Sequence, residues 1–176
     1  MSKLLDEGNL LFDFSSCCDV ERFDDPQTNP DGMKTVDFVA ATDDCLYFIE
    51  VKDYQNPNAT KERREEDYRI LCEAGTQRKT MFSLEMGAKI KDSLLRKYSL
   101  GEKFTKRVVY LLFINSDKLG EYERGLLKEK ISGYVPTGLN DDRFCKFTKI
   151  SFELANVEQL NSRGIICTPK QPRGDV

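Results

Sequence analysis

The 176-residue sequence predicts an α/β fold in which helices flank a mixed β-sheet. Two short strand-like segments, residues 35–39 and 46–52, are separated by a polar connection typical of a β-hairpin. Two stretches with helical character follow the hairpin. Residues 108–114 then form a continuous apolar run typical of a strand that is buried on both faces. This order of elements suits an α/β sandwich with a mixed sheet.

The segments before the hairpin are short. Residues 10–14 are apolar and predict a short strand or the start of a helix. Ser15 or Ser16 is a suitable N-cap for a helix through residues 17–23. Residues 24–32 are rich in proline, asparagine and glycine and predict a loop.

The helices after the hairpin differ in length. A polar helix is expected from about residue 60 to 73, ending near Gly75, and a longer one from about residue 77 to 98. The residues expected on the buried side of the longer helix are Met81, Leu84, Ala88 and Leu95.

The C-terminal third completes the predicted domain. Asp117 is a suitable cap for a helix that runs to about residue 131, and residues 144–154 alternate like a further strand. Residues 156–161 predict a short helix. We expect a single domain over residues 1–167, followed by a disordered tail over residues 168–176.

Composition narrows the classes of function. No apolar run approaches the length that spans a membrane, and the first residues lack the apolar core of a signal peptide. The six cysteines have no Cys-x-x-Cys spacing, which indicates free thiols in a reducing cytoplasm. The chain contains no histidine, which excludes histidine-based catalytic triads and metal sites that need imidazole.

Charge is distributed unevenly along the chain. Residues 1–58 have a balance of −9, whereas residues 59–149 have a balance of +6, mostly from residues 76–107. The basic region is consistent with a surface that faces phosphate groups and equally with an ordinary solvated helix face.

Three charged residues stand inside the apolar hairpin: Asp37, Glu50 and Lys52. Burying a charge there is costly unless it is paired or binds a metal. If residues 43–44 form a two-residue turn, the numbers of paired residues add up to 87, and Asp37 lies directly opposite Glu50. Lys52 shares their face by strand alternation, and a one-residue slip would separate the three. The opposite face would then present Val36, Phe38, Ala40, Tyr47, Ile49 and Val51 to the core.

This arrangement resembles the PD-(D/E)XK nuclease superfamily, whose signature is an acid on one strand and Glu-x-Lys on the next. The match is Asp37 and, after twelve residues, Glu50-Val51-Lys52, with Val36 in the place of the family's proline. It covers about residues 33–114. The resemblance implies a restriction-endonuclease-like fold and a metal-dependent nuclease that hydrolyses nucleic-acid phosphodiester bonds.

The resemblance also implies roles for the trio. Asp37 and Glu50, together with the backbone carbonyl of Val51, would bind Mg²⁺ or Mn²⁺ through hard oxygen ligands. Lys52 would orient the attacking water or neutralise charge in the transition state.

Some members of the superfamily add an acid upstream and a glutamine or lysine downstream. The candidates are Glu7 or Glu21 upstream, and Gln77 or Lys79 at the start of the long helix, although each also suits a surface role. The expected partner is nucleic acid, with DNA favoured over RNA, and such nucleases often form homodimers to cut both strands.

A second interpretation stays open. Asp37, Glu50 and Lys52 can form a cross-strand ion cluster without a metal, on a fold that has no catalytic activity. The protein would then be an interaction protein that binds a protein or nucleic-acid partner.

Overall fold

The computed structural model describes residues 3–72, 77–141, 143 and 149–170. Across these residues the chain forms eight strands in two sheets and four α-helices, which confirms the predicted mixed α/β class. None of the helices within the described ranges is both long and apolar enough to cross a membrane.

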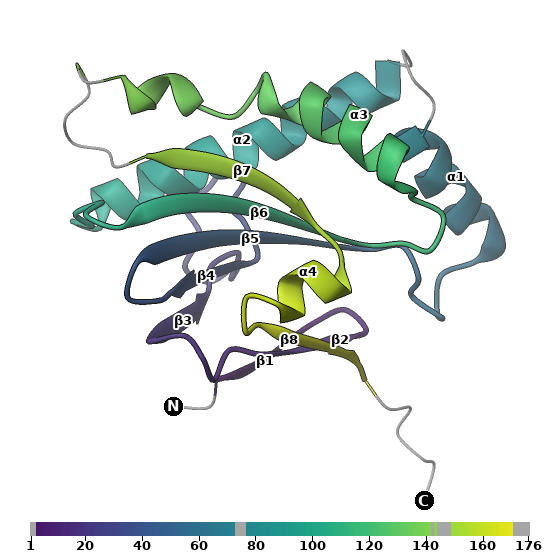
Figure 1. Cartoon of the computed structure of the whole chain (residues 1–176), viewed down its shortest axis with the longest axis horizontal. Helices are drawn as coiled ribbons and strands as arrows, with labels where there is room; N and C mark the ends of the chain where they lie inside the picture. Colours follow the sequence, from purple (N-terminus) through teal and green to yellow (C-terminus); the bar gives the residue numbers. More distant parts are fainter. Residues whose placement is uncertain (1–2, 73–76, 142, 144–148, 171–176) are drawn as a thin grey trace, which may run out of the picture.

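The main sheet has five strands in the order β3-β4-β5-β6-β7 (Figure 1). They are β3 (Asp19–Arg22), β4 (Phe38–Ala41), β5 (Cys45–Asp53), β6 (Arg107–Asn115) and β7 (Ile150–Ala155). The first three pair antiparallel, whereas β5, β6 and β7 pair parallel. Strand β6 lies between β5 and β7, and its residues 108–114 are all buried, as the continuous apolar run predicts.

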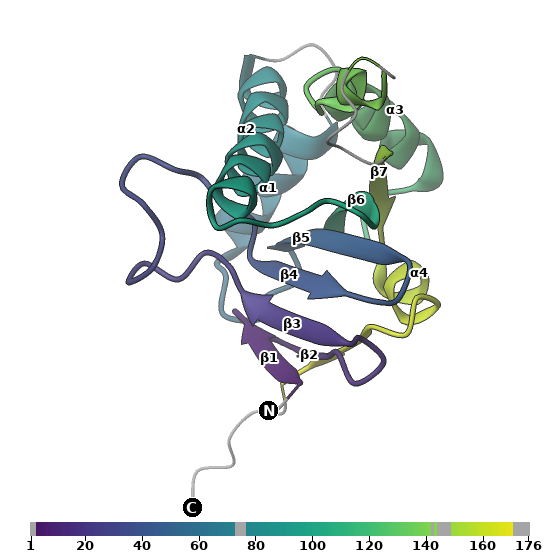
Figure 2. The ribbon, with the colours of Figure 1, turned by 90° about the vertical axis from the view of Figure 1, so that its left-hand side faces the viewer.

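Three helices cover one face of this sheet (Figure 2). They are α1 (Lys61–Cys72), α2 (Gln77–Ser99) and α3 (Glu121–Ser132). Their buried side chains pack on the sheet in one apolar cluster, to which α2 contributes Phe82, Met86, Ile90 and Leu94. A short 3₁₀ helix, η1 (Thr137–Asn140), follows α3.

A three-stranded sheet and a short helix cover the other face. The strands are β1 (Leu4–Glu7), β2 (Leu10–Asp13) and β8 (Ile166–Pro169), in the order β1-β2-β8, and the helix is α4 (Val157–Asn161). A second apolar cluster fills the space between the two sheets. Within it the ring of Phe12 lies 5.5 Å from that of Phe38 and 5.7 Å from that of Phe113.

Two predictions about the ends of the domain were wrong. Residues 19–22 form strand β3 rather than part of a helix, because an isolated helix of seven residues is marginal and this segment pairs with the outer edge of β4. Thr168 and Pro169, expected in a disordered tail, belong to β8, where they pair with Leu11 and Leu10. Residues 171–176 lie outside the described part of the chain.

Two helix predictions also need correction. Met81, Leu84 and Leu95 of α2 are 60%, 44% and 53% exposed. Helix α2 carries two apolar stripes, and the stripe that packs on the sheet is the one formed by Phe82, Met86, Ile90 and Leu94. Periodicity alone does not distinguish the two stripes. Helix α3 begins after Gly120 instead of being capped by Asp117, although it reaches residue 132 as expected.

Several other predictions are confirmed. Helix α1, the bounds of α2, strand β2 and the short helix α4 with its Asn156 N-cap lie where the sequence pattern indicates them. The predicted strand over residues 144–154 begins at Ile150, and residues 144–148 fall outside the described ranges. The four cysteines whose side chains the structure describes, Cys17, Cys18, Cys45 and Cys167, are free thiols.

Candidate active site

The register of the β4–β5 hairpin is the predicted one. Phe38 pairs with Ile49, and Ala41 with Leu46, so that paired numbers add up to 87. The Thr42 N–H donates to the Cys45 carbonyl at 2.9 Å and closes the hairpin. Continuing this register by one step beyond the first pair places Asp37 opposite Glu50.

The turn itself uses side chains rather than a left-handed backbone. No non-glycine residue of the described chain has a positive φ, so residues 43–44 do not form a type I′ turn. Instead, the Cys45 N–H donates to the Thr42 hydroxyl at 3.2 Å. The Lys106 ammonium also donates to the Thr42 carbonyl at 2.6 Å.

The two faces of the hairpin divide as alternation predicts, with one exception. Phe38, Ala40, Ile49, Val51 and Tyr47 all belong to the apolar cluster between the sheets. Val36, expected among them, packs instead in the cluster under the helices. It precedes β4, where strict strand alternation does not apply.

Asp37 takes the place of a missing strand neighbour. Strand β4 begins at Phe38, so Val51 lies beyond the last residue pair of the hairpin. The Val51 N–H donates to Oδ2 of Asp37 at 2.5 Å, and Asp37 is only 5% exposed. Because the N–H and C=O of one strand residue point to the same side, the Val51 carbonyl is also directed toward the β4 side.

Glu50 is fully enclosed and is held by two ammonium groups. Its Oε1 lies 2.7 Å from Nζ of Lys52, and its Oε2 lies 2.8 Å from Nζ of Lys89. Lys89 belongs to α2 and also lies 3.8 Å from Oδ1 of Asp37. The hairpin and the helix together therefore assemble two carboxylates and two ammonium groups.

Lys89 was not among the predicted site residues. It was counted only as part of the basic region of the sequence. One signal was available, because Met86 lies three residues before it and Ser93 four residues after it on the same helix face, and both are fully buried. A lysine on the inner side of a helix requires a buried acidic partner.

Burial governs the protonation of this cluster. It raises the pKa of Asp37 to about 8, with a further contribution from the nearby Glu50 carboxylate, whereas Lys89 and the Val51 N–H act in the opposite direction. Burial lowers the pKa of Lys89, but the Glu50 and Asp37 carboxylates outweigh it and leave that pKa raised. At neutral pH the Lys89 ammonium is charged and the Asp37 carboxyl is largely protonated.

Of the two upstream acids predicted, Glu7 lies beside Asp37. Carboxylate oxygens of Glu7, Asp24 and Asp37 all lie within 4.8 Å of one another. The Arg22 guanidinium lies 2.7 Å from Glu7 and 3.9 Å from Asp24 and offsets part of this negative charge. Asp24 lies in the segment that the sequence predicts as a loop, and no local pattern indicates that it neighbours the site.

The remaining predicted residues are Glu21, Gln77 and Lys79. Glu21 is not part of that acidic group, and its carboxylate pairs with Lys97. Gln77 and Lys79 lie in the first turn of α2, but their side chains lie outside the part of the structure that is described. Their predicted role stays a prediction.

Comparison of the chain with protein-family models, with curated protein sequences and with solved structures gave no match in any of the three. The cluster of Asp37, Glu50, Lys52 and Lys89 is therefore interpreted from its own geometry. It combines oxygen donors that suit a hard cation with a partly exposed ammonium that suits an anionic substrate.

Proposed function

We propose that this protein is a metal-dependent nuclease of the PD-(D/E)XK type, which hydrolyses nucleic-acid phosphodiester bonds. One observation carries the proposal: Asp37 and Glu50 lie 3.8 Å and 2.8 Å from the same Lys89 ammonium, and Lys52 contacts the Glu50 carboxylate at 2.7 Å. Burying charged residues at this depth costs free energy unless they are paired or bind a metal, and such residues cluster at functional sites.

The residues present fit a divalent metal ion. Oxygens of Asp37 and Glu50 both lie within 4 Å of one cation, the Lys89 ammonium, so the two carboxylates converge on a point where positive charge is stable. Asp37, Glu50 and the Val51 carbonyl would hold Mg²⁺ or Mn²⁺. When bound, such an ion supplies Lewis-acid chemistry, which polarises a phosphoryl oxygen and makes an attacking water more acidic.

The chain's own groups have separate tasks in this proposal. Lys52 has 25% of its side chain exposed, so its ammonium can orient the attacking water or neutralise charge on the phosphoryl group. Lys89, with 14% of its side chain exposed, positions the two carboxylates from α2. Glu7 and Asp24 keep the surroundings of Asp37 negative.

The proposal also covers the substrate of the protein, its assembly and its location in the cell. The substrate is nucleic acid, with DNA favoured over RNA, and the chain would act as a homodimer. The four free thiols are consistent with action in the reducing cytoplasm.

Cleavage assays test this function directly. Supercoiled plasmid and single-stranded oligonucleotides are incubated with Mg²⁺, Mn²⁺ or EDTA, using wild type, Asp37→Asn, Glu50→Gln and Lys52→Met. Each variant is expected to lose about 10²–10³-fold in rate. Glu153→Gln is the control, because Glu153 is an ion-paired carboxylate that lies outside the cluster, on β7. Equal cleavage by all variants, or cleavage in EDTA, would overturn the proposal.

A second function is favoured by one specific observation. Both oxygens of Glu50 already contact ammonium groups, so the two lysines and two acids can balance one another without a metal. The protein would then be a non-catalytic interaction protein for a protein or nucleic-acid partner. Calorimetric titration with Mn²⁺ separates the two functions: the nuclease requires binding that Glu50→Gln removes, and the interaction protein requires none.

A further inference from the structure

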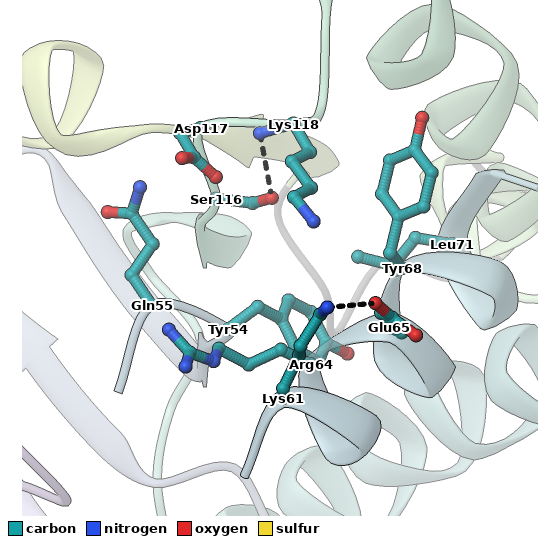
Figure 3. Close-up of a pocket in the computed structure, with 10 residues that line it drawn as sticks. All are labelled: Tyr54, Gln55, Lys61, Arg64, Glu65, Tyr68, Leu71, Ser116, Asp117 and Lys118. Atoms are coloured by element: carbon teal, nitrogen blue, oxygen red, sulfur yellow. Dashed lines mark hydrogen bonds and ion pairs between the residues drawn. The ribbon is translucent and has the colours of Figure 1, made fainter. Parts of the chain in front are cut away.

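A cavity of about 570 Å³ lies beside the candidate site but shares none of its four charged residues. We call it the basic pocket, and the residues that characterise it are Tyr54, Lys61, Arg64, Tyr68 and Lys118 (Figure 3). None of these residues was singled out in the sequence.

The basic pocket lies where ligands commonly bind in sheets of this type. Tyr54 directly follows β5, and Lys118 belongs to the connection that follows β6, so the pocket opens beyond the carboxyl ends of two parallel strands. The Tyr54 N–H donates to the Asn115 carbonyl at 3.0 Å and joins the two strand ends. Tyr54 is two residues beyond Lys52, or about 7 Å along an extended chain. A strand bound at the candidate site would reach the pocket directly.

The charges around the pocket favour an anion. Lys61, Arg64 and Lys118 line it together with two acids, Glu65 and Asp117. Lys61 is partly neutralised by Glu65 at 3.9 Å. Among the described residues, no carboxylate lies within ion-pair distance of Arg64 or Lys118. The Arg64 guanidinium and the Lys118 ammonium can therefore bind an anion in the open cavity.

An aromatic ring accompanies these charges. Tyr68 is 36% exposed, and the Lys118 ammonium lies 5.6 Å from the centre of its ring. Figure 3 shows the side chains of Lys61 and Lys118 pointing toward each other across the cavity, with the Tyr68 ring beside them. Cations interleaved with an exposed aromatic ring are the combination that holds phosphates and unstacked bases together.

We propose that the basic pocket binds a single-stranded nucleic-acid segment, with one phosphate at Lys118, a neighbouring phosphate at Arg64 on the other side of the cavity, and a base against Tyr68. A duplex keeps its bases stacked and cannot offer one to the ring. The inference rests on the proposed nuclease in naming its substrate class, but binding at the pocket requires neither metal nor cleavage.

Fluorescence anisotropy with a labelled single-stranded oligonucleotide in EDTA tests the pocket. Tyr68→Leu is expected to weaken binding by about 5-fold to 100-fold, whereas Tyr68→Phe retains the ring and should bind as wild type. Lys118→Gln is expected to weaken binding and to reduce the salt slope by about 0.7. The matched controls on α3 are Tyr122→Leu, at a tyrosine that is 74% exposed, and Lys128→Gln. Circular dichroism verifies that each variant is folded.

Several results would overturn the inference. The first is that wild type does not bind the oligonucleotide, and the second is that Tyr68→Leu binds it as well as Tyr122→Leu does. The third is that a duplex of the same sequence binds as tightly as the single strand. The fourth is that a mononucleotide competes for the pocket as well as the single strand does. Failure of the nuclease proposal looks different, because it is measured as metal-dependent cleavage, whereas binding at the pocket is measured in EDTA and compared between Tyr68→Leu and Tyr122→Leu. Lost cleavage with intact binding, or the reverse, therefore shows which proposal fails.

Discussion

The ammonium group of Lys89 lies 2.8 Å from Oε2 of Glu50, a carboxylate with no exposed surface. Helix α2 thus supplies the positive charge that strand β5 needs in order to bury the Glu50 side chain. The same ammonium lies 3.8 Å from Asp37, so one helical residue links both acids of the hairpin.

Replacing Lys89 tests this dependence. Lys89→Met keeps the length of the side chain but leaves Glu50 with Lys52 alone, and we expect a loss of about 3–5 kcal/mol in the free energy of unfolding. Urea denaturation measures it. Lys91→Met is the control, because Lys91 is exposed on the same helix. Equal stability of the two variants would show that Lys89 does not hold the cluster together.

Asp37 should make stability depend on pH. Its pKa is raised to about 8 in the folded protein, against about 3.9 in an unfolded chain, so the folded state holds the extra proton between these values. Stability contributed by Asp37 is therefore present at low pH and is lost as the pH rises through 8. Asp37→Asn keeps an acceptor for the Val51 N–H without this titration.

When the pH is raised from 5 to 9, wild type loses the stability contributed by Asp37, whereas Asp37→Asn does not. We therefore expect the difference in free energy of unfolding between variant and wild type to shift in favour of the variant by about 2–4 kcal/mol. Urea denaturation at both pH values measures the difference. Asp141→Asn, at an exposed carboxylate, serves as the comparison. Parallel stability curves for wild type and Asp37→Asn would contradict a raised pKa at Asp37.

Gly87 should tolerate no side chain. A Cβ at this position of α2 would lie 2.5 Å from Cβ of Tyr134 and 3.0 Å from its carbonyl oxygen. Alanine normally stabilises a helix by about 1 kcal/mol relative to glycine, but here we expect Gly87→Ala to destabilise the protein by about 1–3 kcal/mol. Thermal denaturation measures it, with Gly125→Ala of α3 as control, because a Cβ there meets no atom within 4 Å. A stabilised Gly87→Ala variant would show that this close approach is absent.

Phe12 should anchor the small sheet to the large one. It has no exposed surface, and its ring lies within about 6 Å of three other phenylalanine rings. Phe12→Ala is expected to cost about 3–5 kcal/mol in urea denaturation. Ile166→Ala, at an exposed residue of β8, should cost much less. Similar losses for both would contradict an anchoring role.

Local rules predicted the hairpin because its residues are close in sequence. Counting back from residues 43–44 was enough to place Asp37 opposite Glu50, even though the turn type differs from the expected one. The same rules identified β6, whose run of apolar residues admits only a buried position.

The features that the sequence did not predict depend on contacts between segments that are distant in the sequence. Lys89 is 39 positions from Glu50, and only the packing of α2 on the sheet decides which of its two apolar stripes turns inward. Residues 19–22 became a strand because the edge of β4 was open to them, which no local preference encodes. The proximity of Glu7 to Asp37 likewise depends on a small sheet formed by both ends of the chain.

That small sheet has a kinetic consequence. Strand β2 is completed by β8, so residues near position 10 must wait for residues near position 168 to be synthesised and to find them. Contacts of such long sequence separation form slowly, because the chain must close a large loop first. The small sheet that carries Glu7 is thus expected to be completed last, when β8 joins the local β1–β2 pair, and the electrostatic surroundings of Asp37 are complete only then.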